Sequence, residues 1–162
     1  MKEGGIDMRE PKTGALDILA QEHRNVTIKL KQLETATTSM EKGEMARENW
    51  LVLEQFSEFI KKEIRNHFKN EDKVLFPILG EILGMESGPV AQMSEEHQIL
   101  YEAFDHLQNG VEKKEKKEAL EGAKIILNIF NEHIRKEDNL LYQVARESLA
   151  PWQLEEVNKK MQ

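Results

Sequence analysis

Apolar residues recur along most of this chain with the three- and four-residue spacing of amphipathic α-helices, and not with the alternation of β-strands. Glycine, proline and asparagine residues interrupt this spacing at Gly43, across 80–89 and at Asn109-Gly110. The pattern predicts four long helices and one short helix, over residues 15–40, 44–75, 89–108, 117–149 and 151–160.

Two prolines refine these boundaries. Pro77 is expected to end or kink the second helix, and Pro89 to open the third. Short connections make consecutive helices antiparallel neighbours, which predicts an all-α fold, an up-down-up-down antiparallel four-helix bundle with a short extra C-terminal helix. We expect a flexible N-terminal tail over 1–14, the bundle over 15–150 and the short helix within 151–162. The 162 residues suffice for one domain but not for two.

The chain also repeats a polar motif. Glu-His occurs at 22–23 and at 96–97, early in the first and third helices. His-x-x-x-Glu-Asp occurs at 67–72 and at 133–138, and these hold the only two Glu-Asp dipeptides of the sequence. A helical hairpin carrying the same two motifs in the same order is therefore present twice.

The spacing within the motif places its side chains on one face of a helix. Residues four apart are separated by about 40° around the axis and about 6 Å along it. His67 and Glu71 therefore point toward the same neighbour, as do His133 and Glu137. An isolated pair of this kind is usually an exposed ion pair. Here all four histidines of the repeat lie on the apolar face, and buried imidazoles and carboxylates satisfy one another best around cations.

The distances to the connectors support one common layer. His23 and His67 are equidistant from position 45, His67 and His97 from position 82, and His97 and His133 from position 115. In an antiparallel hairpin, residues equidistant from the loop lie at the same height, so the four histidines should converge. His106, nine residues after His97, points to the opposite side of its helix and is expected at the surface.

Imidazole and carboxylate ligands suit iron, manganese or zinc. Two octahedral ions offer about twelve positions, of which four histidines, two bridging glutamates and an oxide or hydroxide would fill about ten. About two positions then remain for water, dioxygen, nitric oxide or peroxide, as in a reactive or ligand-binding site. Ferritin-like carboxylate proteins are another class that holds two metal ions, but they need Glu-x-x-His. No histidine of this chain has a glutamate three residues before it, so this class is excluded.

Three segments together resemble the hemerythrin-like HHE cation-binding family over roughly residues 15–150: HFKNEDKVLFP from His67, GPVAQMSEEH from Gly88 and HIRKEDNLLY from His133. The resemblance implies a centre of two iron ions with an oxo or hydroxo bridge, with zinc or manganese as alternative occupants of a purified sample. The residues that it implies as metal ligands are His23, His67, Glu71, His97, His133 and Glu137.

Oxygen-carrying hemerythrins have a fifth histidine one turn after the third-helix histidine, where this chain has Tyr101. This difference favours functions other than oxygen storage. Tyr101 and Glu63 lie within about 40° of a ligand histidine, so each is a candidate extra ligand or hydrogen-bond partner. The alternatives are a core aromatic for Tyr101 and a boundary residue turned to water for Glu63. Glu22 and Glu96 are expected mainly as surface charges or partners of a ligand, and the spacing assigns no role to Asp72 and Asp138.

These features favour a non-haem di-iron protein that binds, senses or detoxifies O2, NO or peroxide, or handles iron, and that is not itself an enzyme. The alternative is a repair factor for oxidatively or nitrosatively damaged iron–sulfur centres, because the ligand set is similar to that of di-iron proteins linked to such repair. Those proteins usually carry an amino-terminal cysteine-bearing domain, which this sequence lacks. A third option is a structural bundle whose polar layer holds zinc or nothing.

Composition narrows the possibilities further. A net charge of −7 without a basic stripe argues against nucleic acid as a partner. The absence of cysteine excludes disulfides, thiolate catalysis and protein-ligated iron–sulfur clusters. Residues 1–14 are too polar for a signal peptide or anchor, and no apolar run approaches the roughly 18 residues of a membrane span. We therefore expect a cytoplasmic protein with a diatomic or peroxide ligand and no membrane partner.

Overall fold

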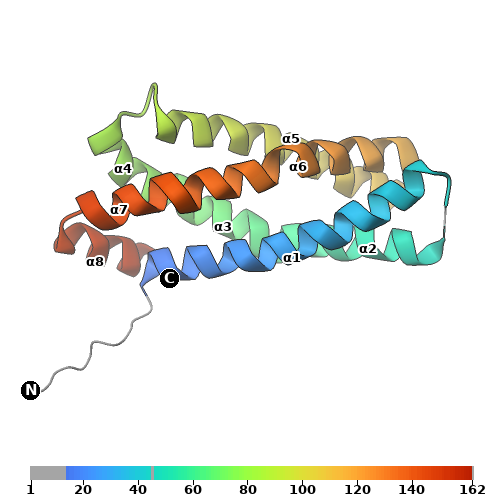
Figure 1. Ribbon diagram of the computed structural model, residues 1–162, viewed down its shortest axis with the longest axis horizontal. Helices are drawn as coiled ribbons and strands as arrows, with labels where there is room; N and C mark the ends of the chain where they lie inside the picture. Colours follow the sequence, from blue (N-terminus) through green and yellow to red (C-terminus); the bar gives the residue numbers. More distant parts are fainter. Residues whose placement is uncertain (1–13, 45, 162) are drawn as a thin grey trace, which may run out of the picture.

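The computed structural model describes residues 14–44 and 46–161, and this part of the chain is almost entirely helical, without a strand (Figure 1). Three short π-helical turns, labelled η, interrupt the α-helices. The expected tail over 1–14 lies outside the described residues except for Gly14. In chain order the elements are α1 (Ala15–Glu41), α2 (Arg47–Phe59), η2 (Ile60–Ile64), α3 (Arg65–Asn70), η3 (Glu71–Leu75), α4 (Phe76–Leu83), α5 (Pro89–Lys113), α6 (Lys116–Lys136), η4 (Glu137–Leu141), α7 (Tyr142–Ser148) and α8 (Pro151–Lys160).

Four long helical segments lie lengthwise against one another. They are α1, the continuous segment from α2 to α4, α5, and the continuous segment from α6 to α7. The contacts run from α1 to α2 and α6, and from α5 to α2 and α6. The turns after α1 and α5 lie at one end of the molecule in Figure 1, and the turn after α4 lies with α8 at the other. This arrangement is consistent with the expected four-helix bundle.

The third helix is longer than the sequence pattern indicates, because the expected break at Asn109-Gly110 is wrong. Helix α5 continues to Lys113, and the chain turns at Lys114, which has a left-handed φ of 57°. Gly110 is buried within the helix, where a Cβ would lie 2.3 Å from the backbone nitrogen of Ala119 on α6. This glycine therefore permits a close approach of two helices and does not end one.

The second segment does not end at Pro77, where an end or a kink was expected, since α4 carries Pro77 in its first turn and runs to Leu83. The π-helical turn η3 directly precedes α4. Proline does not cause this turn, because η4 forms at the equivalent place before Gln143, which stands where the first copy has Pro77. The start of the same segment differs as well: it begins at Arg47 and not at residue 44.

The interior consists of two apolar clusters. One includes Leu33, Phe56 and Phe104 and extends toward the turn that follows α1. The other includes Leu19, Leu79 and Val157, so the short helix α8 closes that end of the core. The buried histidines and glutamates lie between the two clusters along the helices. The fold therefore places one polar layer inside an otherwise apolar core.

None of the helices in the described ranges combines the length and the apolar character that spanning a membrane requires.

The α5–α6 contact gives a test of the packing. A Cβ at Gly122 would lie 2.5 Å from the Leu107 nitrogen and 2.6 Å from the Ala103 carbonyl oxygen. Alanine in an unobstructed helix interior stabilises by about 1 kcal/mol over glycine. Because backbone atoms cannot move away here, Gly122→Ala is expected to lower the free energy of unfolding, measured by chemical denaturation, by about 1–3 kcal/mol. Glu121→Ala, at the exposed neighbouring position, is the control, and a Gly122→Ala protein more stable than wild type would refute this packing.

Candidate metal centre

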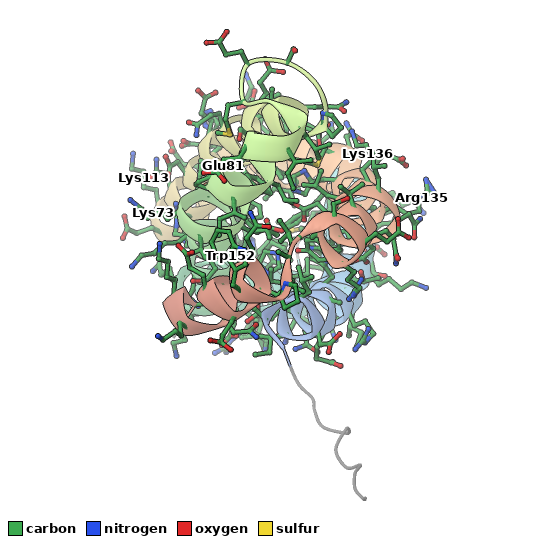
Figure 2. The ribbon with its side chains drawn as sticks, turned by 90° about the vertical axis from the view of Figure 1, so that its left-hand side faces the viewer. Lys73, Glu81, Lys113, Arg135, Lys136 and Trp152 are labelled. Atoms are coloured by element: carbon green, nitrogen blue, oxygen red, sulfur yellow. The ribbon has the colours of Figure 1, made fainter. Side chains whose placement is uncertain are left out.

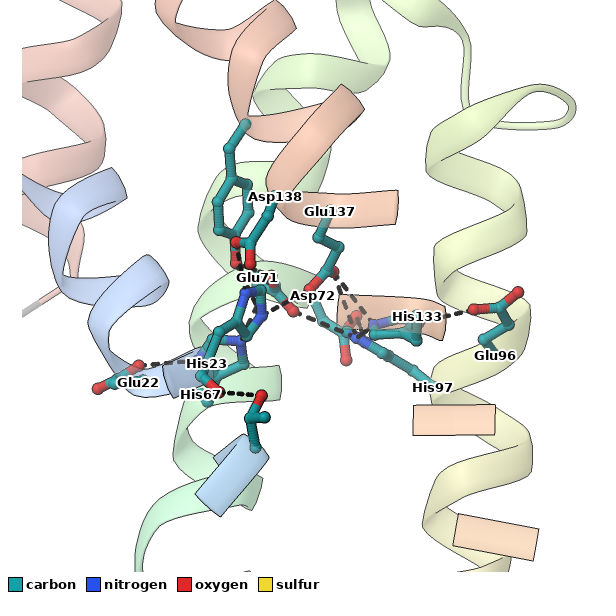
Figure 3. A network of polar contacts seen from close by, with 12 residues as sticks. Glu22, His23, His67, Glu71, Asp72, Glu96, His97, His133, Glu137 and Asp138 are labelled. Atoms are coloured by element: carbon teal, nitrogen blue, oxygen red, sulfur yellow. Dashed lines mark hydrogen bonds and ion pairs between the residues drawn. The ribbon is translucent and has the colours of Figure 1, made fainter. Parts of the chain in front are cut away.

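Six side chains of the repeated motif meet in the polar layer (Figure 3). The four histidines and two glutamates that the sequence singles out are each at most 2% exposed. They form two groups whose nitrogen and oxygen atoms lie within 4.8 Å of one another, and both groups share the two glutamates. The first group, called site A, is His23, His67, Glu71 and Glu137; the second, called site B, is His97, His133, Glu71 and Glu137.

Within each site the two imidazoles present their Nε2 atoms to one another. These atoms are 3.1 Å apart between His23 and His67 and 3.2 Å apart between His97 and His133. Two ligand nitrogens at about 2.1 Å from one ion, at right angles to each other, lie about 3.0 Å apart. The spacing of each histidine pair therefore fits adjacent ligands of one ion.

The two glutamates divide their oxygens between the sites. Glu71 places Oε2 3.5 Å from His67 Nε2 in site A and Oε1 3.2 Å from His97 Nε2 in site B. Glu137 places Oε1 2.9 Å from His23 Nε2 and Oε2 3.2 Å from His133 Nε2. Each carboxylate thus faces both sites with one oxygen each, which is the orientation of a carboxylate that bridges two ions.

A second set of carboxylates holds the outer side of every imidazole. The Nδ1 atoms of His23, His67, His97 and His133 each lie 2.8 Å from a carboxylate oxygen of Asp138, Glu22, Asp72 and Glu96 respectively. Glu22 and Glu96 were expected mainly as surface charges or as partners of a ligand, and no role was assigned to Asp72 and Asp138. The repeated Glu-His and Glu-Asp pairs were the signal that could have identified them, since each acid contacts a histidine of another helical segment.

This arrangement fixes the tautomer of the rings. A carboxylate only accepts hydrogen bonds, so Nδ1 carries the proton and Nε2 points its lone pair into the layer. There it faces carboxylate oxygens, and Glu71 Oε1 and both oxygens of Glu137 are buried without a hydrogen-bond donor among the described residues. Acceptors that face acceptors in a buried space need a cation. The donor set therefore fits metal ions, because it offers imidazole and carboxylate groups and no thiolate.

The charge of the glutamates also acts on the histidines when protons are the only cations. Burial alone would lower the pKa of His67, but the charge of Glu71 and the hydrogen bond to Glu22 outweigh it and raise this pKa to about 10. Burial likewise opposes ionisation of His133, and Glu137 overcomes it and raises the pKa to about 10.

Site B follows the same pattern at its other histidine. Against the effect of burial, the hydrogen bonds to Asp72 and Glu71 raise the pKa of His97 to about 8. Burial would raise the pKa of the Glu71 carboxyl, yet the charges of His67 and His97 hold it well below its usual range. The layer thus requires positive charge, which either protons or metal ions can supply.

The π-helical turns explain a residue that sequence reasoning missed. Both η3 and η4 begin at a shared glutamate, and residues five apart share a face in a π-helix. Phe76 and Tyr142, each five residues after its glutamate, therefore turn into the layer, and both are at most 1% exposed. With α-helical spacing Tyr142 would lie about 140° from Glu137, so only the π periodicity could have revealed it.

The remaining candidates lie outside the two sites. The Tyr101 hydroxyl donates to Asp72 Oδ2 at 3.2 Å, so Tyr101 supports the carboxylate behind His97, which is the hydrogen-bonding role among its two expected ones. Glu63 is exposed, which agrees with the alternative of a boundary residue turned to water and not with that of an extra ligand or hydrogen-bond partner. It lies in the π-helical turn η2, where α-helical spacing no longer applies. His106 is 50% exposed, as expected for a surface histidine.

The outer carboxylates give the first test of the site. Asp138→Asn keeps the size of the side chain but replaces the charged acceptor behind His23 with a neutral amide. Loss of such a partner commonly weakens metal binding about 10–100-fold, and we expect this range in competition with a chelator. Asp105→Asn is the matched control, because Asp105 is an exposed carboxylate that pairs with Arg65. Equal affinities of the two variants would show that the outer carboxylate does not tune its histidine.

The raised histidine pKa values give a second test, on the metal-free protein. Each imidazolium–carboxylate interaction is fully present below about pH 6.5 and is lost as pH rises through the folded-state pKa, about 8 for His97 and about 10 for His67 and His133. Chemical denaturation in a chelator should therefore show stability falling between pH 6.5 and 10, by about 2 kcal/mol from His97 alone. A divalent metal should remove this fall. Stability that rises with pH over this interval in the chelator would contradict the arrangement.

Comparison with known proteins agrees with the geometry. The family model of the hemerythrin HHE cation-binding domain matches residues 14–145. No curated protein and no solved structure gave a significant match. The matched range covers the four long helices up to α7 and includes every residue of sites A and B. The chain therefore belongs to the hemerythrin HHE cation-binding domain family.

Proposed function

We propose that this protein holds two iron ions in sites A and B of an up-down-up-down bundle and uses them to bind, sense or detoxify dioxygen, nitric oxide or peroxide, or to handle iron. Membership of the family establishes cation binding. What we propose in addition is the number of ions, their identity as iron and the small ligand that they bind. The observation that carries it is the division of the Glu71 and Glu137 oxygens between two histidine pairs.

The residues of the layer have distinct tasks in this proposal. His23 and His67 hold one ion, His97 and His133 hold the other, and the two glutamates bridge them. Two bridged irons would supply reversible one-electron chemistry and coordination positions open to a small ligand. The outer carboxylates keep the four Nε2 atoms aimed inward. The apolar clusters on both sides of the layer exclude bulk water from it.

Burial limits the kind of ligand. All six proposed ligand residues are inside the bundle, so only a molecule of a few atoms can reach them without a rearrangement of the helices. Dioxygen, nitric oxide and peroxide satisfy this condition. Repair of damaged iron–sulfur centres requires in addition that iron leaves the layer for an acceptor, and this alternative stays a prediction, as does the cytoplasmic location. The third alternative is a structural bundle whose polar layer holds zinc or no metal, and such a layer would carry out no redox chemistry.

The test is anaerobic reconstitution with ferrous iron followed by metal analysis. Wild-type protein is expected to retain about two irons per chain and, on oxidation, to show the near-ultraviolet absorption of a coupled ferric pair. His67→Ala and His133→Ala each remove one histidine from one site and are expected to lower the content to about one iron or less. His106→Ala should retain both irons, because its histidine lies at the surface.

Two results would contradict the proposal. One is a wild-type protein that binds a single iron or none under conditions in which it is folded. The other is unchanged iron content in both His67→Ala and His133→Ala. Zinc retained in preference to added ferrous iron, without a ferric spectrum, would favour the structural alternative.

A further inference from the structure

The repeat makes sites A and B nearly equivalent, but one pair of corresponding positions breaks the equivalence. Five residues after Glu71 the chain has Phe76, and five residues after Glu137 it has Tyr142. Both side chains are buried, and each ring stacks on a histidine of one site. The two sites therefore differ in the chemistry of the side chain that covers them.

Site B is covered by hydrocarbon rings. Phe68 stacks on the His97 ring with centroids 3.9 Å apart and planes at 10°, and Phe76 stacks on it at 5.4 Å and 25°. The residue that corresponds to Phe68 in the second copy of the repeat is Ile134. The rings over site B thus fill space beside the imidazole and offer no hydrogen-bond donor.

Site A is covered by a ring with a polar end. The Tyr142 ring lies parallel to the His23 ring, with centroids 5.2 Å apart and planes at 4°. Its hydroxyl donates a short hydrogen bond to Glu71 Oε2 and lies 3.4 Å from His23 Nε2. Both of these atoms face site A, so the hydroxyl oxygen borders the space in which a small ligand of that site would lie.

The other polar groups of the layer cannot take the place of this hydroxyl. The Nδ1 protons of the four histidines are directed outward to carboxylates, and the inward-facing groups are acceptors. The Tyr142 hydroxyl can turn about its C–O bond from Glu71 to a ligand, and Glu71 would then keep its interaction with the bound cation. A buried donor already in position stabilises negative charge that develops next to it.

We propose that site A is the position at which the small ligand binds, and that the hydroxyl of Tyr142 donates a hydrogen bond to it. This inference rests on the proposed function, because it needs two bound irons and an open position. It makes Tyr142 a determinant of which ligands bind: those that carry or acquire negative charge, such as peroxide, are favoured over neutral ligands that do not.

The test uses azide as the anionic probe on the diferric protein, with Tyr142→Phe as the variant. A hydrogen bond to a charged group is worth enough that its loss should weaken azide binding at least about tenfold, while two irons are retained. Tyr101→Phe removes the same hydroxyl from a tyrosine that faces Asp72 and not the sites, and its effect on azide affinity should be smaller. Optical titration measures the affinities, with iron content and circular dichroism determined on the same samples.

A second measurement needs no variant. In wild-type protein the infrared stretch of bound azide should shift between H2O and D2O, because the donor is an exchangeable hydroxyl. Unchanged azide affinity of Tyr142→Phe at two irons, or the absence of this shift, would overturn the inference and leave the proposed function intact. An intense visible phenolate-to-iron band that disappears in Tyr142→Phe would also overturn it, because Tyr142 would then be a ligand of iron. Failure of the two-iron wild type to bind azide at all would contradict the open position and hence both proposals.

Discussion

The burial of two carboxylates in one layer of the bundle is the constraint on which the rest of the structure depends. Glu71 and Glu137 are fully inaccessible to solvent, and an isolated carboxylate in such surroundings is strongly unfavourable. Four imidazoles surround them at distances that suit either ion pairs or shared metal ions. The raised pKa values of these histidines express the same demand for positive charge. Binding of metal ions to this layer would therefore be an exchange of cations, in which protons leave and metal ions enter.

The duplicated motif meets this constraint through contacts between helical segments. Glu22 of α1 holds His67 of α3, while His23 of the same helix is held by Asp138 of η4. The second copy repeats this exchange among α5, η3 and α6. Because every imidazole is tied to a carboxylate on another segment, the orientation of the rings depends on the packing of the whole bundle. The apolar clusters on either side of the layer provide that packing.

Sequence reasoning succeeded where the α-helical period holds and failed where it changes. His67 with Glu71 and His133 with Glu137 lie in or at the end of regular helix, and the four-residue spacing correctly placed them on one face. Tyr142 lies beyond a π-helical turn, which rotates the following residues relative to an α-helix, so its entry into the layer was not foreseen. The family resemblance was correct, and the residue that breaks the symmetry of the two sites was the one that the spacing could not place.

Pro89 and Pro151 open α5 and α8 as expected, but Gly110 and Pro77 were poor guides to helix ends. The backbone preferences of glycine and proline act locally in the sequence. The glycine at position 110 is instead required by the close approach of α6, which the neighbouring sequence does not reveal. Pro77 lies just after η3 in a segment that continues as helix to Leu83, so the proline alone does not end the helix.

The π-helical turns connect these observations to function. They begin at the two shared glutamates, and Pro77 stands six residues after one glutamate where Gln143 stands six residues after the other, so a proline does not determine them. Their common effect is to place the fifth residue after each glutamate against a histidine ring, Phe76 against His97 and Tyr142 against His23. A regular α-helix would keep the glutamate in the layer but direct that residue elsewhere, and the histidines would lose the rings that stack on them. Insertion of one residue into the helical turn thus lets a single segment supply both a glutamate shared by the two sites and the ring that covers one of them. The identity of that cover, phenylalanine or tyrosine, can then differ between the sites without a change in either glutamate.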